Sequence, residues 1–262
     1  MIKNLLRLII CINFLFGQGG GYALDFDGSN DYSQHGTNSS LRPSSALTIE
    51  VWVNLHTNSN WEGMVSYATD NGNTESGYDL YCKGQSTYKW SLAIARNGMS
   101  AGDWRSDPYT NLTPSQWIHI AGTYDGSTMN FYENGVLSTT QSRSGDIDWN
   151  PAPDNLYLGR FRDSDEANYF DGYLDEVRIW SDARTVTEIR ENMHKELAGD
   201  ESGLVAYYKM SDGSGSSLTD NSSNSNTGTL TNMNASDDWV TSYAPIGDLG
   251  SSYQTDTEGI WK

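Results

Sequence analysis

The sequence predicts an all-β protein built as a two-sheet antiparallel β-sandwich with one short helix. Short segments of alternating apolar and polar residues recur along the 262 residues, and each is bounded by turn-forming residues. Glycine is plentiful at 26 residues, and aromatic side chains make up 12% of the chain. The regular alternation of strands with crossover helices that marks a parallel sheet does not occur. These features are typical of sandwiches and jelly rolls.

The first half of the chain contains five expected strands separated by turns. They span residues 22–26, 47–53, 64–67, 78–83 and 89–96. The first strand ends in the cluster Asp27-Gly28-Ser29-Asn30-Asp31, whose residue types favour a tight turn. Because side chains alternate between faces along a strand, Glu50 and Trp52 should lie on the face opposite to Ile49 and Val51.

The second half opens with the clearest hairpin of the chain. Residues 117–124 and 128–134 are joined by Asp125-Gly126-Ser127, and Asn134-Gly135 then favours another tight turn with positive φ angles. Further strands are expected at residues 136–140, 156–160, 173–180, 203–210 and 228–230.

One segment has helical rather than strand periodicity. Thr185 and Glu188 match a capping box, in which the threonine oxygen and the glutamate satisfy the first backbone N–H groups. Ile189, Met193 and Leu197 then recur at helical spacing. We expect a short helix from about residue 186 to residue 195.

The strand at residues 173–180 raises a question about Asp175. Strict alternation puts Asp175 on the same face as Val177 and Ile179, and Glu176 on the opposite face. A carboxylate that points towards a core is unfavourable unless it is paired, hydrogen-bonded or bound to a metal. Only 16 Lys and Arg residues stand against 34 Asp and Glu residues, so calcium is the leading candidate partner.

The N-terminal residues 1–21 have the layout of a secretory signal peptide. Lys3 and Arg7 precede an apolar run from Leu8 to Phe16, and several glycines follow. The run is too short to span a bilayer. We expect the folded domain over residues 22–244 and a linker, or the start of a further domain, over residues 245–262. The expected localisation is secreted or cell-surface, without membrane insertion.

The charge balance excludes some classes of partner. Loss of residues 1–21 removes two basic side chains, which leaves 14 against 34 acidic ones and takes the formal charge from −18 to −20. Such a surface repels nucleic acid and anionic membranes, so nucleic acid is not an expected partner. Cys82 is the single cysteine that remains, so the fold has no internal disulfide.

Five segments, in order along the chain, carry a resemblance. They are ALDFDGSNDY (23–32), LTIEVWV (47–53), WIHIAGTYDG with FYENG (117–126 and 131–135), GYLDEVRIW (172–180) and the polar loop from DNS to Gly228 (220–228). Together they resemble the laminin-G-like, concanavalin A-like jelly-roll family, which is related to pentraxins. The resemblance covers roughly residues 22–233. It implies two antiparallel sheets packed face to face, with the first and late strands as neighbours.

The resemblance also implies a cofactor, because many members carry one calcium ion between these two segments. Carried over to this chain, the ligands are Asp27, Asp175 and oxygens of the Asn30–Asp31 turn, with Asp171 as a further possibility. For Asp27, Asn30 and Asp31 the alternative is ordinary turn chemistry, in which Asp and Asn bond their own backbone. That alternative is weaker for Asp175 because of the face it is expected to occupy.

Catalytic motifs are weak in this sequence. Gly98-Met99-Ser100-Ala101-Gly102 matches the nucleophile-elbow pattern, but the following residues cannot start the helix which that motif needs. Asp175 and Glu176 are expected on opposite faces and cannot flank a sugar as a glycosidase pair. Glu50 is a lone strand carboxylate, for which a structural role is the simpler interpretation. The domain is therefore not expected to be an enzyme.

Binding is the better interpretation. Trp61, Trp104 and Trp149 fall in Gly/Asn/Asp-rich loops, where their rings could stack on sugars while Arg105 and Arg160 hold hydroxyl or acid groups. The alternative is that these rings cap the open ends of the sandwich.

We therefore expect a secreted, calcium-stabilised module that binds carbohydrate or extracellular matrix, within a larger extracellular protein. The alternatives are a non-catalytic adhesion or spacer module and an accessory domain of a polysaccharide-degrading enzyme. The expected partner is a glycan or a matrix or surface polymer, and the oligomeric state is left open.

Overall fold

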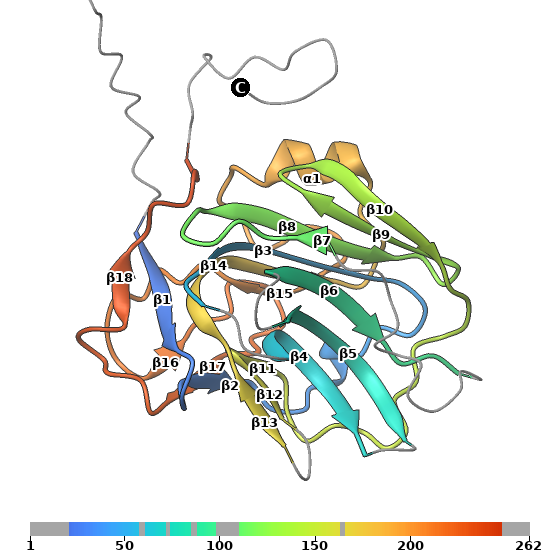
Figure 1. The fold of residues 1–262 in the computed structure, drawn as a ribbon, viewed down its shortest axis with the longest axis horizontal. Helices are drawn as coiled ribbons and strands as arrows, with labels where there is room; N and C mark the ends of the chain where they lie inside the picture. Colours follow the sequence, from blue (N-terminus) through green and yellow to red (C-terminus); the bar gives the residue numbers. More distant parts are fainter. Residues whose placement is uncertain are drawn as a thin grey trace, which may run out of the picture.

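The computed structural model describes residues 21–57, 61–71, 74–84, 88–97, 110–162 and 166–247. Within these ranges the chain forms two large antiparallel sheets packed against each other, with one short α-helix outside them (Figure 1). The predicted two-sheet sandwich with a single short helix is confirmed. The expected signal peptide and the tail from residue 248 onward lie outside the described residues.

The first sheet, here sheet A, contains the first and the late strands. Its order is β10 (Val136–Ser142), β9 (Thr128–Glu133), β8 (Ile118–Tyr124), β3 (Leu47–Leu55), β14 (Asp171–Trp180), β1 (Tyr22–Asp27) and β18 (Trp239–Thr241). β15 (Leu204–Tyr208) pairs with the second half of β14, and β1 pairs with its first half. The expectation that the first and late strands are neighbours is therefore confirmed.

The second sheet, here sheet B, is built from shorter strands at one end and longer strands at the other. Its order is β16 (Ser217–Leu218), β17 (Gly228–Thr231), β2 (Tyr32–Gln34), β11 (Tyr157–Leu158), β4 (Glu62–Asp70), β5 (Glu75–Lys83), β6 (Lys89–Ile94) and β7 (Thr110–Asn111). A separate hairpin pairs β12 (Arg160–Arg162) with β13 (Ala167–Tyr169). A 3-10 turn, η1 (Ser39–Leu41), follows β2.

Local sequence signals produce the turns and the helix that they predict. Asn134 and Gly135 have φ angles of 47° and 70°, as the hairpin turn requires. The helix α1 (Val186–Asn192) is opened by the predicted capping box, in which Thr185 Oγ1 accepts from the Glu188 backbone and Glu188 Oε2 accepts from the Thr185 backbone. α1 ends three residues earlier than expected and packs its buried Ile189 against Ala121 on β8.

The core lies between the inner faces of the two sheets. Ile49 and Val51 of β3 meet Leu80 and Leu92 of sheet B in one cluster, and all four are fully buried. The apolar face predicted for β3 is thus confirmed. Glu50 and Trp52 lie on the outer face of sheet A, yet they are only 1% and 2% exposed. Something must therefore cover that outer face.

A β-bulge in β14 overturns the predicted position of Asp175. Asp175 pairs with Trp52 and Arg178 pairs with Glu50, so Glu176 and Val177 together face the single residue Val51. Glu176 takes a φ angle of 53°, which accommodates the extra residue. Alternation restarts after the bulge, so Val177 faces the core and Asp175 does not. The prediction that these two residues share a face is wrong.

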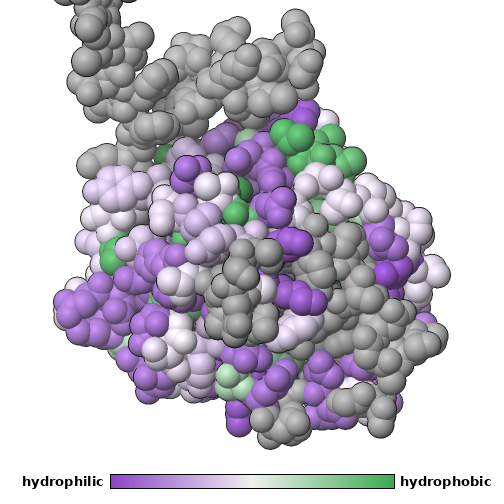
Figure 2. All heavy atoms as spheres, viewed as in Figure 1, coloured by the Kyte–Doolittle hydropathy of each residue, from purple (hydrophilic) through white to green (hydrophobic). Residues whose placement is uncertain are grey.

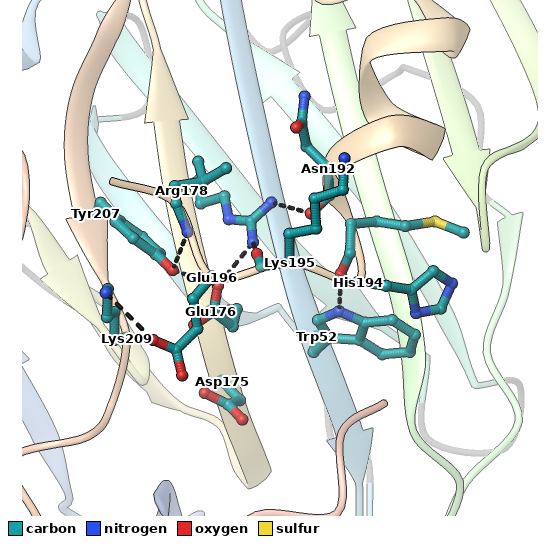
Figure 3. A network of polar contacts seen from close by, with 12 residues as sticks. Trp52, Asp175, Glu176, Arg178, Asn192, His194, Lys195, Glu196, Tyr207 and Lys209 are labelled. Carbon is teal, nitrogen blue, oxygen red and sulfur yellow. Dashed lines mark hydrogen bonds and ion pairs between the residues drawn. The ribbon is translucent and has the colours of Figure 1, made fainter. Parts of the chain in front are cut away.

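The bulge places Glu176 in a buried polar network on the outer face of sheet A (Figure 3). Arg178 Nη2 donates to Glu176 Oε2 at 2.6 Å, and Tyr207 Oη donates to the same oxygen at 2.6 Å. Arg178 also lies 3.6 Å from Glu50 Oε1 and donates to the backbone carbonyls of Asn192 and Lys195. Through these two bonds the Arg178 guanidinium holds the end of α1 and the segment after it against the outer face of sheet A.

Asp175 is covered separately by the C-terminal part of the domain. Ser242 Oγ donates to Asp175 Oδ2, and Ala244 and Ile246 pack nearby against Trp52. Burial, together with repulsion from Glu176, raises the pKa of Asp175 well above its usual value. Asp175 pairs with the outward-facing Trp52, and Glu176 bonds to Arg178 and Tyr207 on the same face, so the expectation that the two carboxylates point to opposite faces is also wrong.

We expect Arg178→Met to lower the free energy of unfolding by about 3–5 kcal/mol, because it leaves two buried carboxylates without their cation. Arg162→Met is the matched control, since Arg162 pairs with Asp154 where both side chains are about half exposed. Its effect should stay within about 1 kcal/mol. Urea denaturation at neutral pH measures both values. Similar losses in the two variants would contradict the role given to Arg178.

Candidate functional site

The predicted site residues fall in two separate regions of the described structure. Asp27, Asn30, Asp31 and Asp171 lie where the end of β1 meets the start of β14. Trp61 and Arg160 lie on the outer face of sheet B. Trp104 and Arg105 lie outside the described residues.

The first region is an acidic cluster formed by Asp25, Asp27, Asp31, Asp171 and Asp238. Asp27 and Asp171 are direct register partners across β1 and β14. Asp31 Oδ2 accepts from the Asp27 backbone at 3.3 Å, and Asp25 donates its backbone N–H to the Asp238 carbonyl at 2.9 Å. Three distant segments therefore bring five carboxylates to one edge of the sandwich.

The turn chemistry that the sequence offered as an alternative is present here. Asp27 Oδ1 accepts from the Ser29 and Asn30 backbone N–H groups at 2.8 and 3.1 Å. Burial acts to raise the pKa of Asp27, but these backbone bonds outweigh it and hold the pKa below its usual value. Asn30 is exposed, and its carbonyl accepts from the Asn232 side chain at 3.0 Å.

Asp31 has the opposite environment. Asp31 is buried, with only 5% of its surface exposed. Burial, followed by repulsion from Asp27 and Asp238, raises the pKa of Asp31 to about 6. His56 lies beside the cluster, with its Nδ1 3.3 Å from Asp171 Oδ1. The cluster thus carries more negative charge than its protein surroundings offset.

Asp175 does not belong to this cluster. It lies four residues beyond Asp171 on β14, which is about 13 Å along an extended strand. Its carboxyl group bonds to Ser242 instead. Among the residues described here, no three His, Cys, Asp or Glu side chains converge as a metal-binding group. The donor chemistry of Asp27, Asp31 and Asp171 suits calcium, but their carboxylates are not drawn together around one point.

The second region is the outer face of sheet B. The strand register places Tyr157, Ser66, Asp79 and Ala93 side by side across β11, β4, β5 and β6. On the neighbouring row Tyr81 pairs with Ser91. Tyr81 and Ala93 belong to a small cluster separate from the main core. This face therefore carries aromatic and hydroxyl side chains rather than a second apolar layer.

Trp61, which the sequence places in a polar loop as a candidate sugar-stacking ring, lies on this face. Its ring lies 5.6 Å from the Tyr81 ring, tilted by 30°, and Lys83 Nζ stands 4.0 Å above it. Trp61 is partly exposed and has a φ angle of 64°, which is strained for a bulky residue. Strain of this kind concentrates at binding sites, because the surrounding structure must hold it in place.

The β12–β13 hairpin forms one wall of this face. It crosses β4 at Gly63, where a Cβ atom would lie 2.3 Å from the Phe161 backbone nitrogen. Only glycine allows so close an approach. Phe161 then packs in the same cluster as Tyr81 and Ala68. The hairpin also presents Arg160, whose guanidinium carbon lies 3.3 Å from the ring centre of Tyr32 and 4.1 Å from that of Tyr157.

Sequence reasoning missed the two tyrosines that flank Arg160. Tyr32 lies in a three-residue strand, which is too short to show alternation, and Tyr157 opens a two-residue strand. Tyr32 ends the segment 23–32 that carries the family resemblance, but the resemblance assigns it no role in a site, and Tyr157 belongs to none of the five segments. The turn residues before Tyr32 were the only local signal near it.

Trp149 does not contribute to either region. Its ring packs against Tyr67 and Tyr78 beside the main core, at ring-centre distances of 5.4 and 5.8 Å. Its indole N–H donates to the Pro43 carbonyl at 3.0 Å. The structure therefore places this ring in the capping role that was its alternative interpretation.

The visible surface gives no sign of a broad apolar interface. Outside the grey atoms, Figure 2 shows mostly hydrophilic and neutral residues, with the largest green area where Figure 1 places α1 and β10. Val136 and Leu137 of β10 are 39% and 50% exposed. Within the described ranges, no helix has the length and apolar character needed to cross a membrane.

Comparison with protein families agrees with this architecture. The model of the concanavalin A-like lectin/glucanases superfamily matches residues 27–190. Pappalysin-1 of Mus musculus is 32% identical over 88 residues. That alignment includes 33% of this chain but only 5% of pappalysin-1, so the chain spans a small part of that relative's length.

Two solved structures share the fold. A putative carbohydrate binding protein from Bacteroides ovatus ATCC 8483 is 21% identical, with a TM-score of 0.58, over 84% of this chain and 61% of that chain. The CBM40 of a Ruminococcus gnavus IT-sialidase, solved with α2,3 sialyllactose, is 12% identical, with a TM-score of 0.51, over 64% and 96% of the two chains.

The acidic cluster predicts a pH effect with a definite sign. Asp31 has a pKa of about 6 in the folded protein and about 3.9 when unfolded, so its ionisation destabilises the fold as pH rises from about 4 to about 6. In chelator, Asp31→Asn should therefore raise the melting temperature at pH 7.5 and leave it nearly unchanged at pH 4.

Asp125→Asn is the matched control for this experiment. Asp125 Oδ1 accepts from Ser127 and Thr128 in a similar Asp-Gly-Ser turn, and these bonds overcome burial and lower the pKa of Asp125. Its substitution should lower the melting temperature at pH 7.5, which is the opposite sign. Equal signs in the two variants would show that Asp31 is not repelled by its neighbours.

Proposed function

This chain belongs to the concanavalin A-like lectin/glucanases superfamily, and from that premise we propose that it is a secreted, non-catalytic carbohydrate-binding module. The proposal takes secretion from the composition of residues 1–21. It takes carbohydrate as the ligand from the outer face of sheet B. A structural relative described as a putative carbohydrate binding protein supports the same direction.

The observation that carries the proposal is the strained, partly exposed Trp61 stacked on Tyr81. A flat aromatic ring offers an apolar face to the C–H groups of a sugar, and neighbouring polar groups can bond its hydroxyls. Lys83 lies over the Trp61 ring and is partly exposed, whereas Ser66 and Asp79 on the adjoining row are buried at 1% and 0% exposure and are not among these polar groups. This combination of ring and polar groups suits a sugar better than an apolar or nucleic-acid ligand.

A binding role also fits the location of a buried Glu–His pair. Glu50 and His119 are each 1% exposed and lie 3.4 Å apart on the outer face of sheet A. Arg178 and the segment after α1 cover them, so they are enclosed away from a substrate. We propose a structural role for this pair. The alternatives are an adhesion or spacer module and an accessory domain of a polysaccharide-degrading enzyme. A test of sugar binding by this chain separates the proposed function from a spacer module.

We further propose that a calcium ion braces the acidic cluster, with Asp27, Asp31 and Asp171 as its carboxylate ligands. Hard oxygen donors of this kind suit Ca²⁺. Burial and then repulsion from Asp27 and Asp238 raise the pKa of Asp31, and a bound divalent cation would offset both effects by favouring the carboxylate. Asp175 is left out of the proposed ligand set, because the register separates it from the other three. The family resemblance supports the position of the ion between β1 and β14.

Trp61→Ala should weaken binding of the best glycan by at least about tenfold, which corresponds to about 1.4 kcal/mol. A glycan array identifies that ligand for the full chain, and isothermal titration calorimetry measures the affinity. Tyr243→Ala is the control, because Tyr243 is 65% exposed on the segment after β18. The proposal fails if no glycan binds the wild type, or if both variants retain its affinity.

Calcium at millimolar concentration should raise the melting temperature by about 5 °C or more relative to chelator, because the ion binds the folded state alone. Asp27→Asn should remove this shift. Asp125 occupies a similar turn outside the acidic cluster, so Asp125→Asn should retain the calcium-dependent shift in melting temperature. Asp175→Asn should retain this shift too. An absent shift in the wild type would refute the calcium proposal, and its loss in Asp175→Asn would refute the ligand set.

A further inference from the structure

Arg160 occupies an unusual environment for a charged side chain. It is the first residue of β12 and only 5% exposed. Its guanidinium carbon lies 3.3 Å from the ring centre of Tyr32 and 4.1 Å from that of Tyr157, and the two rings are nearly perpendicular to each other. Such stacking favours a partly desolvated cation and restricts its orientation. The charge is therefore held in one place by two aromatic rings.

No acid within the described residues neutralises this charge. Arg160 Nε is buried without a hydrogen-bond partner, and the described part of the chain offers Arg160 no carboxylate within ion-pair distance. Arg162, two residues further along the same strand, pairs with Asp154 at 3.2 Å, and Arg178 pairs with Glu176 at 2.6 Å. Arg178 Nε is likewise buried without a hydrogen-bond partner, but among these three arginines only Arg160 has no carboxylate partner in the described part of the chain.

The absence of a partner is informative in a chain with 34 acidic residues. A buried guanidinium is unfavourable unless its donors find acceptors. Of its nitrogens, only Nε is enclosed without a partner, so the two terminal nitrogens remain for a group outside the protein. The planar fork of an arginine matches the two oxygens of a carboxylate. A carboxylate presented to the terminal nitrogens would satisfy their donors.

The surroundings of Arg160 indicate that this anion is part of a sugar. Tyr169 is the register partner of Arg160, and its ring lies 6.4 Å from that of Tyr32. Tyr32 and Tyr169 are both partly exposed, whereas Tyr157 is buried beneath the guanidinium. Two accessible rings beside one oriented arginine can hold an apolar sugar face and an acid group together.

We propose that Arg160, Tyr32 and Tyr169 form a subsite for acidic sugars, in which Arg160 binds the carboxylate of a uronic-acid residue. This inference rests on the proposed carbohydrate-binding function and narrows its ligand class. Tyr157 positions the guanidinium from below. The hairpin that carries Arg160 and Tyr169 is held on β4 by the close approach at Gly63, so the subsite adjoins the face of Trp61.

A matched pair of ligands tests the proposal without any substitution. The full chain is titrated by calorimetry with a galacturonic acid trisaccharide and with the same trisaccharide after its carboxyl groups are reduced to neutral galactose. The acidic form should bind at least tenfold more tightly. A sulfated galactose trisaccharide forms a third arm, and it should bind more weakly than the uronate because a sulfate is not planar.

Arg160→Gln should remove the preference for the uronate, and Arg162→Gln should retain it within twofold. Arg160→Lys keeps the positive charge but loses the planar guanidinium. It should therefore retain less than half of the wild-type difference in binding free energy between the acidic and the neutral trisaccharide. Circular dichroism and the melting temperature establish that each variant is folded. If Arg160→Gln does not fold, the ligand pair measured on the wild type remains decisive.

The outcomes separate this inference from the broader function. Equal binding of the acidic and neutral trisaccharides overturns the acidic subsite but leaves carbohydrate binding in place. A stronger response to the sulfated arm overturns the assignment of a carboxylate. A preference for uronate that survives in Arg160→Gln overturns the role of Arg160. If neither these trisaccharides nor any glycan on the array binds, the proposed function fails together with the subsite.

Discussion

The bulge at Glu176 in β14 is the constraint on which much of this structure depends. β14 is a central strand of sheet A, and it pairs with β3 on one side and with β1 and β15 on the other. The extra residue keeps Leu174 and Val177 in the core and turns Glu176 and Arg178 outward together. Arg178 can then gather Glu50, Glu176 and two backbone carbonyls, which closes the outer face of sheet A. Without the bulge, strict alternation would separate the acid from its cation.

The sequence predicted the parts of this fold that depend on neighbouring residues. Asn134-Gly135 and the capping box of Thr185 and Glu188 act over four residues or fewer, so their signals survive in the sequence. The pairing of β1 with β14 was an expectation that the family resemblance implied. The bulge could not be predicted, because Glu176 is not a residue type that marks a positive φ angle. Its conformation depends on partners more than ten residues away.

The candidate sites show the same division. Asp27, Asp31 and Asp171 lie near one another where the end of β1 meets the start of β14, whereas Asp175 was assigned by an alternation that the bulge interrupts. Trp149 was expected in an open loop, but its partner Pro43 lies 106 residues earlier. The pairing of Arg160 with Tyr32 joins strands that are 128 residues apart in the chain. Contacts of this range leave no local signature, so composition could suggest an aromatic site without locating its members.

The two outer faces of the sandwich differ, because the outer face of sheet A is covered by the segment after α1 and by residues 244–246. The described chain ends on that side, where the Gly247 backbone N–H bonds to the His194 carbonyl at 3.0 Å and residues 244–246 cover Trp52. Sheet B lies on the opposite side of the sandwich. A tether attached after residue 247 therefore leaves from the face away from Trp61 and Arg160. Immobilised through that end on a bead, an electrode or a neighbouring protein, the domain would display sheet B outward, as an oriented receptor layer requires.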